Sequence, residues 1–459
     1  MIRLFNHYLH RRTLLQLFFD LGLVVAVVAG VVLWQGEDIA SALHILAYAS
    51  LLGVGLLVIN SGLGFYQRVH SRSVNQSRAR AVLSLCLAVP LAYALFGLPS
   101  SIQGSRTSLF GAAMVGVLLV LAHRVYVTHS TPQSMMRYRI LVFGTGPRAA
   151  LVGRTLKKED PHVDVVGYYA SPNEPQAEVS AWGILSRNKS LTDTALELEV
   201  DEIVVALAER RGGAMPLREL LDCKLHGIRV VDIATHFEKT KGQIRLDSVY
   251  AGWLIFGDGF TQGGMRTVVK RLFDIFSALI LMILTAPIML VAAVLVALES
   301  RGPILYKQER VGYNGRLFNV VKFRSMRTDA EKDGTPRWAT AQDDRVTRVG
   351  RFIRKVRIDE LPQLFSVLKG DMSMVGPRPE RPYFVDKLTR EIPYYAVRQS
   401  VKPGVTGWAQ VRYHYGATLE DSAEKLQYDL YYVKNHSLFL DLVVLFETVS
   451  VVLMAKGAR

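Results

Sequence analysis

The stretch LFDIFSALILMILTAPIMLVAAVLVAL, from Leu272 to Leu298, decides how this chain is folded. It is long enough to cross about 30 Å of hydrocarbon as a helix. However, Pro287 stands near its middle, where a proline removes a backbone hydrogen bond and kinks a helix. Lys270 and Arg271 precede the stretch and a basic segment follows it. Because positive loops stay on the cytoplasmic side, we expect a helix–break–helix hairpin that dips into one leaflet.

The segment after this stretch is strongly basic. From Arg301 to Arg357 it holds 15 Lys and Arg against 6 Asp and Glu, a net charge of +9. An ordinary membrane span with a harmless proline would place this segment outside the cell, away from nucleotide substrates. The broken hairpin keeps it in the cytoplasm, provided that the broken backbone is covered, and is the interpretation we favour.

The composition of the whole chain excludes several classes of protein. Its 459 residues carry 55 Lys and Arg against 40 Asp and Glu, a net charge of +15, and 50% of them are hydrophobic. So much apolar surface excludes a disordered chain, and two cysteines cannot form a disulfide scaffold. A nucleic-acid partner is not favoured, because the cations lie beside apolar stretches without interleaved aromatic residues for base stacking.

Further apolar stretches fill the N-terminal third of the chain, at Leu14–Trp34, Ile39–Ile59, Ala81–Leu98 and Leu109–Tyr126. Each has roughly the length of a membrane helix. Arginines gather before the first stretch, after the second and after the fourth. The positive-inside rule then places both ends of the group in the cytoplasm. We therefore predict a four-helix transmembrane bundle over residues 1–130.

Strand and helix patterns alternate over residues 137–255. Strands are predicted at Ile140–Phe143, Val163–Tyr169, Glu202–Leu207 and Gly227–Ile233. This alternation indicates a small, Rossmann-like α/β domain with a parallel sheet. After the first strand, Gly144 and Gly146 form a G-x-G-x-x-A turn whose backbone amides could hold a nucleotide phosphate. No acidic residue follows the second strand to bind a ribose, so a nucleotide fold that serves regulation or assembly stands as the alternative.

Two adjacent carboxylates stand among cations in the segment RFIRKVRIDELPQL, residues 351–364. We expect the first, Asp359, to cap the N-terminus of a helix that carries Pro362 in its first turn and ends at Gly370. The helix dipole and the cations favour ionised forms of Asp359 and Glu360. An ionised carboxylate is a competent nucleophile toward phosphorus and a hard ligand for Mg²⁺. An ordinary helix cap or surface pair would explain these two carboxylates taken alone.

A second polar feature lies downstream, where Arg378 stands between Pro377 and Pro379. Two prolines make a rigid turn, which can hold one guanidinium against a phosphate. An ordinary surface turn would explain this tripeptide alone. The functional interpretation gains weight because the turn and the carboxylates share one basic, membrane-attached domain.

These segments resemble the bacterial sugar transferases that act as polyprenyl-phosphate hexose-1-phosphate transferases, the large monotopic phosphoglycosyl transferases, and among them the undecaprenyl-phosphate glucose phosphotransferases. The similarity covers nearly all of the last 190 or so residues. Its strings are KRLFD (270–274), GPILYKQERVG (302–312), KFRSM (322–326), DELPQL (359–364), KGDMSMVGPRPE (369–380), KPGVTGWAQ (402–410) and KLQYDLYY (425–432).

The resemblance implies an enzyme that moves a hexose 1-phosphate from a UDP-sugar to undecaprenyl phosphate and releases UMP. It implies that Asp359 attacks the β-phosphorus and forms a phosphosugar–aspartyl intermediate, with Glu360 assisting through proton handling or metal positioning. Mg²⁺, held by these two carboxylates, would stabilise charge on the leaving nucleotide. Arg354 and Arg378 match the phosphate-binding arginines of the family.

The resemblance also assigns roles at the membrane. Lys270 and Arg271 would meet the headgroup of the anionic lipid, and Pro287 matches the break of a re-entrant helix. The family often has Ser-Pro at the break, whereas this chain has Ala286 before the proline, so one side-chain helper of the break is missing.

Together these features predict three parts: the bundle over residues 1–130, the α/β domain over 137–255 and a mostly α catalytic domain over 265–459. The catalytic domain would face the cytoplasm at the inner membrane of a bacterium, at the first membrane step of exopolysaccharide, O-antigen or capsule synthesis. A UDP-sugar, undecaprenyl phosphate and membrane lipids are the expected partners, and a homo-oligomer stays open. Two alternatives are an NAD-dependent nucleotide-sugar oxidoreductase or epimerase that uses the Gly144 turn, and a non-catalytic polysaccharide-assembly scaffold.

Overall fold

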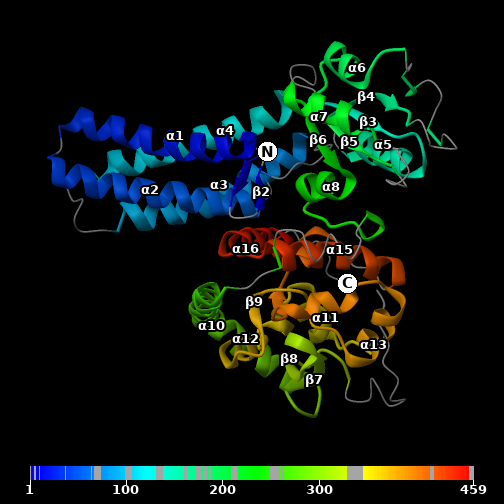
Figure 1. Cartoon of the computed structure of the whole chain (residues 1–459). Coiled ribbons are helices and arrows are strands. Elements are labelled where there is room, and N and C mark those ends of the chain that lie inside the picture. Colours follow the sequence, from blue (N-terminus) through cyan, green and yellow to red (C-terminus); the bar gives the residue numbers. More distant parts are fainter. Residues whose placement is uncertain are drawn as a thin grey trace. The chain divides into compact units, whose positions relative to one another are not determined.

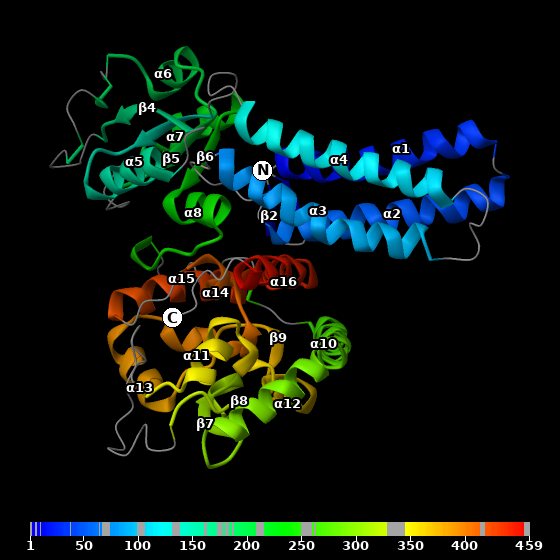
Figure 2. The same ribbon diagram turned by 180° about the vertical axis from the view of Figure 1, so that it is seen from behind.

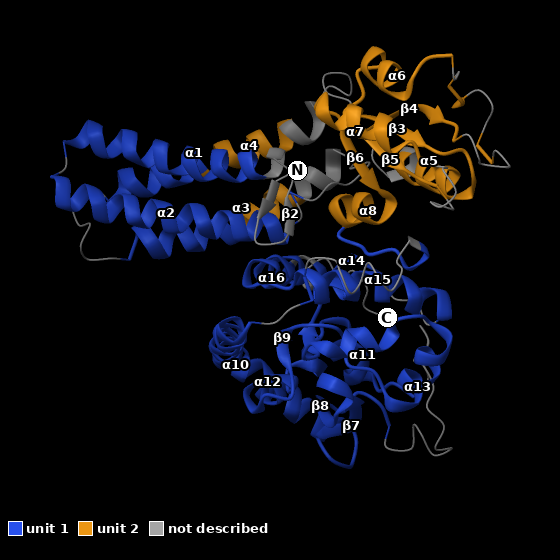
Figure 3. Cartoon of the chain, viewed as in Figure 1, with its two compact units in different colours: residues 1–66, 87–116, 242–459 blue, residues 67–86, 117–241 orange. Residues whose placement is uncertain are grey.

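The computed structural model describes residues 2–4, 7–9, 11–36, 38–63, 65–66, 74–98, 106–130, 138–159, 163–171, 178–179, 183–185, 188–207, 215–248, 259–260, 263–327, 345–413 and 418–453. The chain divides into two compact units, coloured separately in Figure 3: Met1–Tyr66 with Leu87–Gly116 and Gly242–Arg459, and Gln67–Cys86 with Val117–Lys241. The boundary predicted between residues 255 and 265 lies mostly outside the described residues.

The N-terminal third forms long helices after a short antiparallel pair, β1 (Ile2–Leu4) and β2 (His7–Leu9). The helices are α1 (Arg11–Gln35), α2 (Ile39–Gly62), α3 (Val74–Phe96) and α4 (Arg106–Ser130), shown in Figure 1. Glycines allow them to pack closely: a Cβ added at Gly53 of α2 would meet Leu21 of α1, and one added at Gly116 of α4 would meet the backbone of Val24. Small residues at contacts are typical of membrane helices.

Among the residues that the structure describes, four helices are long and apolar enough to cross a membrane: Leu14–Gln35 of α1, Ile39–Gly62 of α2, Arg106–Tyr126 of α4, and Gly264–Glu299 farther along the chain. The predicted span at Ala81–Leu98 lies mostly in α3, whose described side chains form an apolar helix over Arg80–Phe96. Its apolar run begins only after Arg80 and contains Pro90. The chain is thus a membrane protein.

The α/β part contains a four-stranded sheet in the order β4-β3-β5-β6, in which every pair is parallel. Its strands are β3 (Tyr138–Phe143), β4 (Val163–Tyr169), β5 (Glu202–Val205) and β6 (Arg229–Asp232). Its helices are α5 (Pro147–Glu159), α6 (Leu191–Glu197), α7 (Leu217–Leu225) and α8 (Ile233–Lys241). The predicted parallel α/β pattern is confirmed at this level.

Alternation along β3 explains why helices pack on both faces of this sheet. Leu141 and Phe143 share a buried cluster with residues of α6 and α7, whereas Ile140 and Val142 share one with residues of α5 and α8. Successive side chains of a strand point to opposite faces, so an uninterrupted apolar run requires cover on both sides.

The C-terminal part is mostly helical around two small strand pairs. The strands β7 (Leu305–Val311) and β8 (Leu317–Phe323) form a hairpin, and β9 (Ser373–Val375) pairs in parallel with β10 (Gly404–Thr406). The helices are α11 (Arg348–Lys355), α12 (Gln363–Lys369), α13 (Pro382–Glu391), α14 (Trp408–Arg412), α15 (Leu419–Asn435) and α16 (Leu438–Leu453), with short 3₁₀ turns η3 (Leu246–Ser248), η4 (Tyr313–Gly315), η5 (Ile358–Glu360) and η6 (Tyr395–Ser400). Trp408 and Tyr431 stack at 5.8 Å in its core.

The stretch around Pro287 forms α10 (Gly264–Glu299), one helix of 36 residues. The predicted interruption at Pro287 is therefore wrong as a statement about secondary structure, although α10 changes direction along its length in both views (Figures 1 and 2). A proline costs its helix one donor, and nearby the hydroxyl of Thr285 donates to the carbonyl oxygen of Leu281 at 2.7 Å. Such a side-chain bond within a helix often accompanies a bend.

Both ends of α10 contact the same C-terminal part of the chain. Near its N-terminal end, Arg271 donates to carbonyl oxygens of α12. At its C-terminal end, Glu299 accepts the backbone N–H of Val349 in α11 at 3.0 Å. Between these ends the helix is apolar and open, with Ile283 72% exposed and Leu290 68% exposed.

Candidate active site

The two carboxylates lie in a tight turn between helices α11 and α12. Arg357 has a left-handed backbone, with a φ of 61°, and leads into η5, which contains Asp359 and Glu360. The expected N-cap at Asp359 is wrong, because Pro362 takes that position and α12 begins at Gln363. Left-handed φ is uncommon for a residue other than glycine. The turn, rather than a helix end, therefore presents the pair, while the predicted end at Gly370 is confirmed by its φ of 100°.

Glu360 is the better-bonded member of the pair. One of its oxygens, Oε1, accepts Lys322 Nζ at 2.8 Å and Arg378 Nη2 at 2.9 Å. The other, Oε2, lies 3.8 Å from Arg357 Nη1. Although the side chain is buried, these cations, Arg378 foremost, hold the pKa of Glu360 well below its usual range. Glu360 is an ionised anchor for the cations around it.

Asp359 has the opposite electrostatic setting. It is also buried, and among the described residues the short hydrogen bonds and ion pairs of this cluster run to Glu360 instead. Burial, followed by the charge of Glu360, raises the pKa of Asp359 to about 6, against the opposing charges of Lys322, Arg354 and Arg378. Neighbouring acids whose pKa values are pushed apart are the usual sign of divided roles in a site.

The structure brings four of the predicted residues together, namely Asp359, Glu360, Arg354 and Arg378. Sequence reasoning missed Lys322 and Arg357 as members of the cluster. Lys322 lies in β8. In the sequence, the one feature that pointed to Lys322 was its place in the segment KFRSM (322–326), which resembles the family. Arg357 was simply one of several neighbouring cations.

The cations predicted to meet lipid make contacts inside the protein. Lys270 Nζ lies 3.0 Å from both Asp274 Oδ1 and Asp441 Oδ2, which are buried carboxylates. The guanidinium of Arg271 donates to the carbonyl oxygens of Val367 at 2.5 Å and Leu368 at 2.6 Å. These bonds fasten α10 to the C-terminal part, and a headgroup role for either cation stays a prediction.

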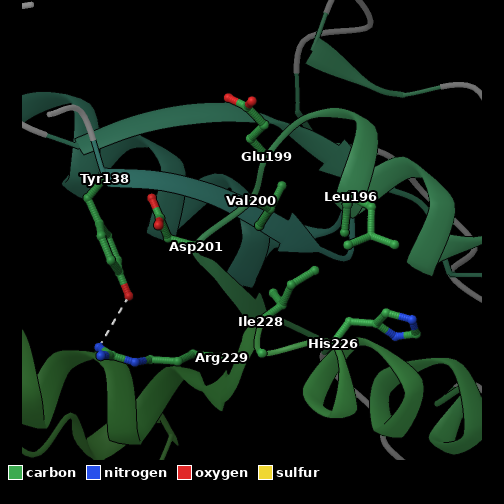
Figure 4. Close-up of a pocket in the computed structure, with 10 residues that line it drawn as sticks. Tyr138, Leu196, Glu199, Val200, Asp201, His226, Ile228 and Arg229 are labelled. Carbon is green, nitrogen blue, oxygen red and sulfur yellow. Dashed lines mark hydrogen bonds between the residues drawn. The ribbon is translucent and has the colours of Figure 1, made fainter. Parts of the chain in front are cut away.

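The glycine turn of the α/β part is far from these carboxylates in sequence. Gly144 has a φ of 124°, its N–H donates to Tyr169 O at 2.9 Å, and α5 begins after Gly146. A cavity of about 310 Å³ in the same part is lined by Tyr138, Asp201 and Arg229, among others (Figure 4). The cavity lies at the end of the sheet where β3 and β6 begin. The Gly144 turn follows the other end of β3. A nucleotide at that turn stays a prediction.

The carboxylate pair fits Mg²⁺ only with help from another molecule. The described residues contain no group of three or more His, Cys, Asp or Glu side chains placed to hold a metal ion. Magnesium commonly takes one or two carboxylates and completes its shell with water and substrate phosphates. Because Glu360 Oε1 already accepts two cations, Asp359 and the free lone pairs of Glu360 are the donors that this chain offers.

Comparisons with known proteins place the carboxylate cluster in a family. The sequence profile described as "Bacterial sugar transferase" matches residues 265–455. A UDP-N-acetylgalactosamine-undecaprenyl-phosphate N-acetylgalactosaminephosphotransferase of Aeromonas hydrophila is 45% identical over 242 residues, 53% of this chain and 56% of the relative. The chain thus spans about half the length of that relative.

Two other relatives are covered more fully. A UDP-glucose:undecaprenyl-phosphate glucose-1-phosphate transferase of Caulobacter vibrioides is 45% identical over 41% of this chain and 71% of its own length. A protein of the same name from Xanthomonas campestris is 33% identical over 343 residues, 73% of this chain and 70% of its own length. With its carboxylate turn, its cations and its similarity over most of these two proteins, the chain belongs to the bacterial sugar transferase family.

Proposed function

We propose that this chain transfers a sugar 1-phosphate from a UDP-sugar to undecaprenyl phosphate and releases UMP. The pair Asp359–Glu360 is the observation that carries the proposal, because one carboxylate is anchored by cations and the other is left to react. The relatives' names, which describe transfer of glucose 1-phosphate or N-acetylgalactosamine phosphate to undecaprenyl phosphate, support it.

In the first step, an oxygen of Asp359 attacks the β-phosphorus of the donor. The bond between that phosphorus and the bridging oxygen breaks, and UMP leaves with the oxygen. The sugar phosphate stays on Asp359 as a mixed anhydride. Arg378, Lys322 and Arg354 supply the positive charge that such a phosphoryl transfer needs, and Glu360 keeps two of these cations in place. Positioning and charge neutralisation supply most of the rate in reactions of this class.

In the second step, a phosphate oxygen of undecaprenyl phosphate attacks the same phosphorus and expels the carboxylate of Asp359. The product is the diphosphate-linked sugar, and the enzyme returns to its starting state. Bound Mg²⁺ would neutralise charge on the diphosphate, with Asp359 and Glu360 as its protein ligands. The protein's own share is to bury the nucleophile and to hold the cations around it.

A membrane-embedded acceptor and a water-soluble donor require a catalyst at the interface. We propose that α10 enters one leaflet and returns, so that both of its ends lie on the cytoplasmic side of a bacterial inner membrane. Its contacts support this geometry, because both ends bond to the same C-terminal part while the apolar middle is exposed. Undecaprenyl phosphate would then present its headgroup close to Asp359.

The test is UMP release from a panel of UDP-sugars, with undecaprenyl phosphate and Mg²⁺. The panel includes glucose, galactose and their N-acetylated forms, because the relatives' names differ in the sugar. We expect release with one or more donors and none from Asp359→Asn. Asp371→Asn is the matched control, since Asp371 pairs with an exposed lysine and should keep activity. Full turnover by Asp359→Asn would overturn the proposed nucleophile, and an NAD-dependent oxidoreductase would tolerate that change.

A further inference from the structure

The loop that carries Arg378 is held at every carbonyl group. Four consecutive carbonyl oxygens, those of residues 377–380, each accept a hydrogen bond, and the donors come from three segments of the chain. The donors are Gly404 N to Pro377 O at 3.0 Å, Arg398 Nη2 to Arg378 O at 2.8 Å, Arg310 Nη1 to Pro379 O at 3.0 Å and Val311 N to Glu380 O at 2.9 Å. The loop is thus fixed by its backbone, independently of where the side chain of Arg378 points.

Arg398 is a buried side-chain donor among these four. Its residue is only 8% exposed, and its Nε and Nη2 lie 2.9 and 2.8 Å from Oδ2 of Asp429. Its Nη1 donates to the hydroxyl of Tyr395 at 3.0 Å. Asp429 therefore neutralises the guanidinium of Arg398, and Asp429 and Tyr395 together orient it toward the carbonyl oxygen of Arg378.

Arg378 in turn reaches the carboxylate cluster, where its Nη2 donates to Glu360 Oε1 at 2.9 Å. A guanidinium can bind a diphosphate well only if its backbone is already in place, because ordering a loop upon binding costs conformational entropy. A shift of about 1 Å in a positioning group can cost a factor of about 10² in rate. The chain Asp429–Arg398–Arg378–Glu360 supplies such support without Arg398 touching the substrate.

We propose that Arg398 is a positioning residue of the transfer reaction, which acts by holding the main chain of Arg378 so that its guanidinium meets Glu360 and the donor diphosphate. This rests on the proposed function. Asp429 and Tyr395 fix Arg398, and Arg310 holds the next carbonyl of the same loop. The competing explanation is that Arg398 and Asp429 form a buried ion pair that serves stability alone.

A double-mutant cycle separates the two explanations. The variants are Arg398→Lys, Arg378→Ala and the double variant, measured as kcat/KM for the UDP-sugar. We expect Arg398→Lys to lower kcat/KM by about 10- to 100-fold in the native background and by less than about 2-fold once Arg378 is alanine. A residue that serves stability alone would lower it by the same factor in both backgrounds, and that result would overturn the proposal.

Two further variants keep the cycle interpretable. Arg412→Lys is the matched control, because Arg412 also pairs with a carboxylate, Glu447, and no hydrogen bond or ion pair of the described residues joins it to the loop. It should show the same small factor in both backgrounds. If Arg398→Lys yields no folded protein, Tyr395→Phe replaces it in the cycle, since it removes only the hydroxyl that accepts from Arg398. The same loss with and without the Arg378 side chain would again refute the coupling.

Affinity for UDP, measured by calorimetry, tests the proposal without requiring turnover. Arg398→Lys should weaken UDP binding in the native background and leave it unchanged in the Arg378→Ala background. If the wild type released no UMP from any donor, the proposed function would fail while the UDP cycle still reported on Arg398. Equal UDP affinity for wild type and Arg398→Lys would overturn the positioning role itself.

Discussion

At the scale of single residues, two adjacent carboxylates differ because of their neighbours. Glu360 accepts two cations on one oxygen, whereas burial and the charge of Glu360 dominate the setting of Asp359. The sequence could place both acids among cations, and it did so correctly. It could not say which acid the cations would hold, because that depends on Lys322 arriving from a strand 38 residues away.

Opposite effects on stability should follow from removing each charge. In EDTA at pH 8, Asp359→Asn should raise the midpoint of thermal denaturation, because the folded state favours the protonated acid; the full shift corresponds to about 1–3 kcal/mol. Glu360→Gln should lower the midpoint, because it leaves Lys322 and Arg378 without their partner, at a cost of about 2–4 kcal/mol. Differential scanning calorimetry of the purified variants measures both. Equal shifts of the same sign would contradict the assignment.

The gain from Asp359→Asn should also depend on pH. The pKa of this acid rises from an ordinary 3.8 to about 6 on folding, so the folded wild type binds the proton more tightly than the unfolded chain. The stability of the wild type therefore falls as pH rises between these values. The variant's advantage should be full above about pH 6 and smaller at pH 5. An advantage that is constant from pH 5 to pH 8 would argue against a raised pKa.

Lys322 should matter to catalysis more than other lysines of its hairpin. Lys322→Gln leaves Glu360 Oε1 with Arg378 alone, and we expect kcat/KM for the UDP-sugar to fall about 10-fold or more, since a charge-assisted bond contributes about 1.5–3 kcal/mol. Lys307→Gln, at an exposed position of β7, should leave it unchanged. UMP-release kinetics decide the matter, and similar kinetics for the two variants would remove Lys322 from the site.

At the scale of elements, α10 shows what a sequence pattern can and cannot specify. Its apolar length, its cationic flanks and its proline are all visible in the sequence. Whether Pro287 interrupts or merely bends the helix depends on local bonds such as that from Thr285, and the helix in fact continues. The long-range contacts of Lys270 with Asp441 and of Arg271 with α12 could not be predicted either, because these partners lie more than 90 residues away.

The hydrogen bonds from Arg271 to α12 should stabilise the packing of α10 against α12. Arg271→Met removes two charged donors from the carbonyl oxygens at the end of α12 and should lower stability by about 1–3 kcal/mol. Lys369→Met, which breaks an exposed ion pair at the same helix end, should have almost no effect. Thermal denaturation of both variants tests this. A stable Arg271→Met that has lost binding to anionic vesicles would instead support the headgroup role.

Pro287 should be needed for the return of α10 to the cytoplasmic side. Pro287→Ala restores a backbone donor and straightens the helix, so we expect reduced UMP release and altered labelling of a cysteine placed at Ser300, in a background without the native cysteines. Ala286→Ser recreates the dipeptide common in the family and should keep both readouts at wild-type values. Unchanged labelling and activity in Pro287→Ala would contradict the re-entrant geometry.

At the scale of the whole molecule, the chain combines a membrane part, a parallel α/β part and a cation-rich C-terminal part. The sequence predicted all three kinds of structure, because membrane helices and buried parallel strands leave long apolar signals. It predicted a rigid turn around Arg378 from the two prolines, but not the donors that fix that loop, since hydrogen bonds to backbone carbonyls leave no mark in the sequence of the loop itself.

The central claim is that Asp359 carries the sugar phosphate between donor and acceptor. Its most direct test is intact-mass spectrometry of the protein treated with the UDP-sugar and Mg²⁺ in the absence of undecaprenyl phosphate. We expect a mass gain equal to one sugar phosphate, which maps to the peptide containing Asp359, disappears on adding the acceptor and never forms in Asp359→Asn. Product formation by an enzyme that never gains this mass at Asp359 would contradict the account.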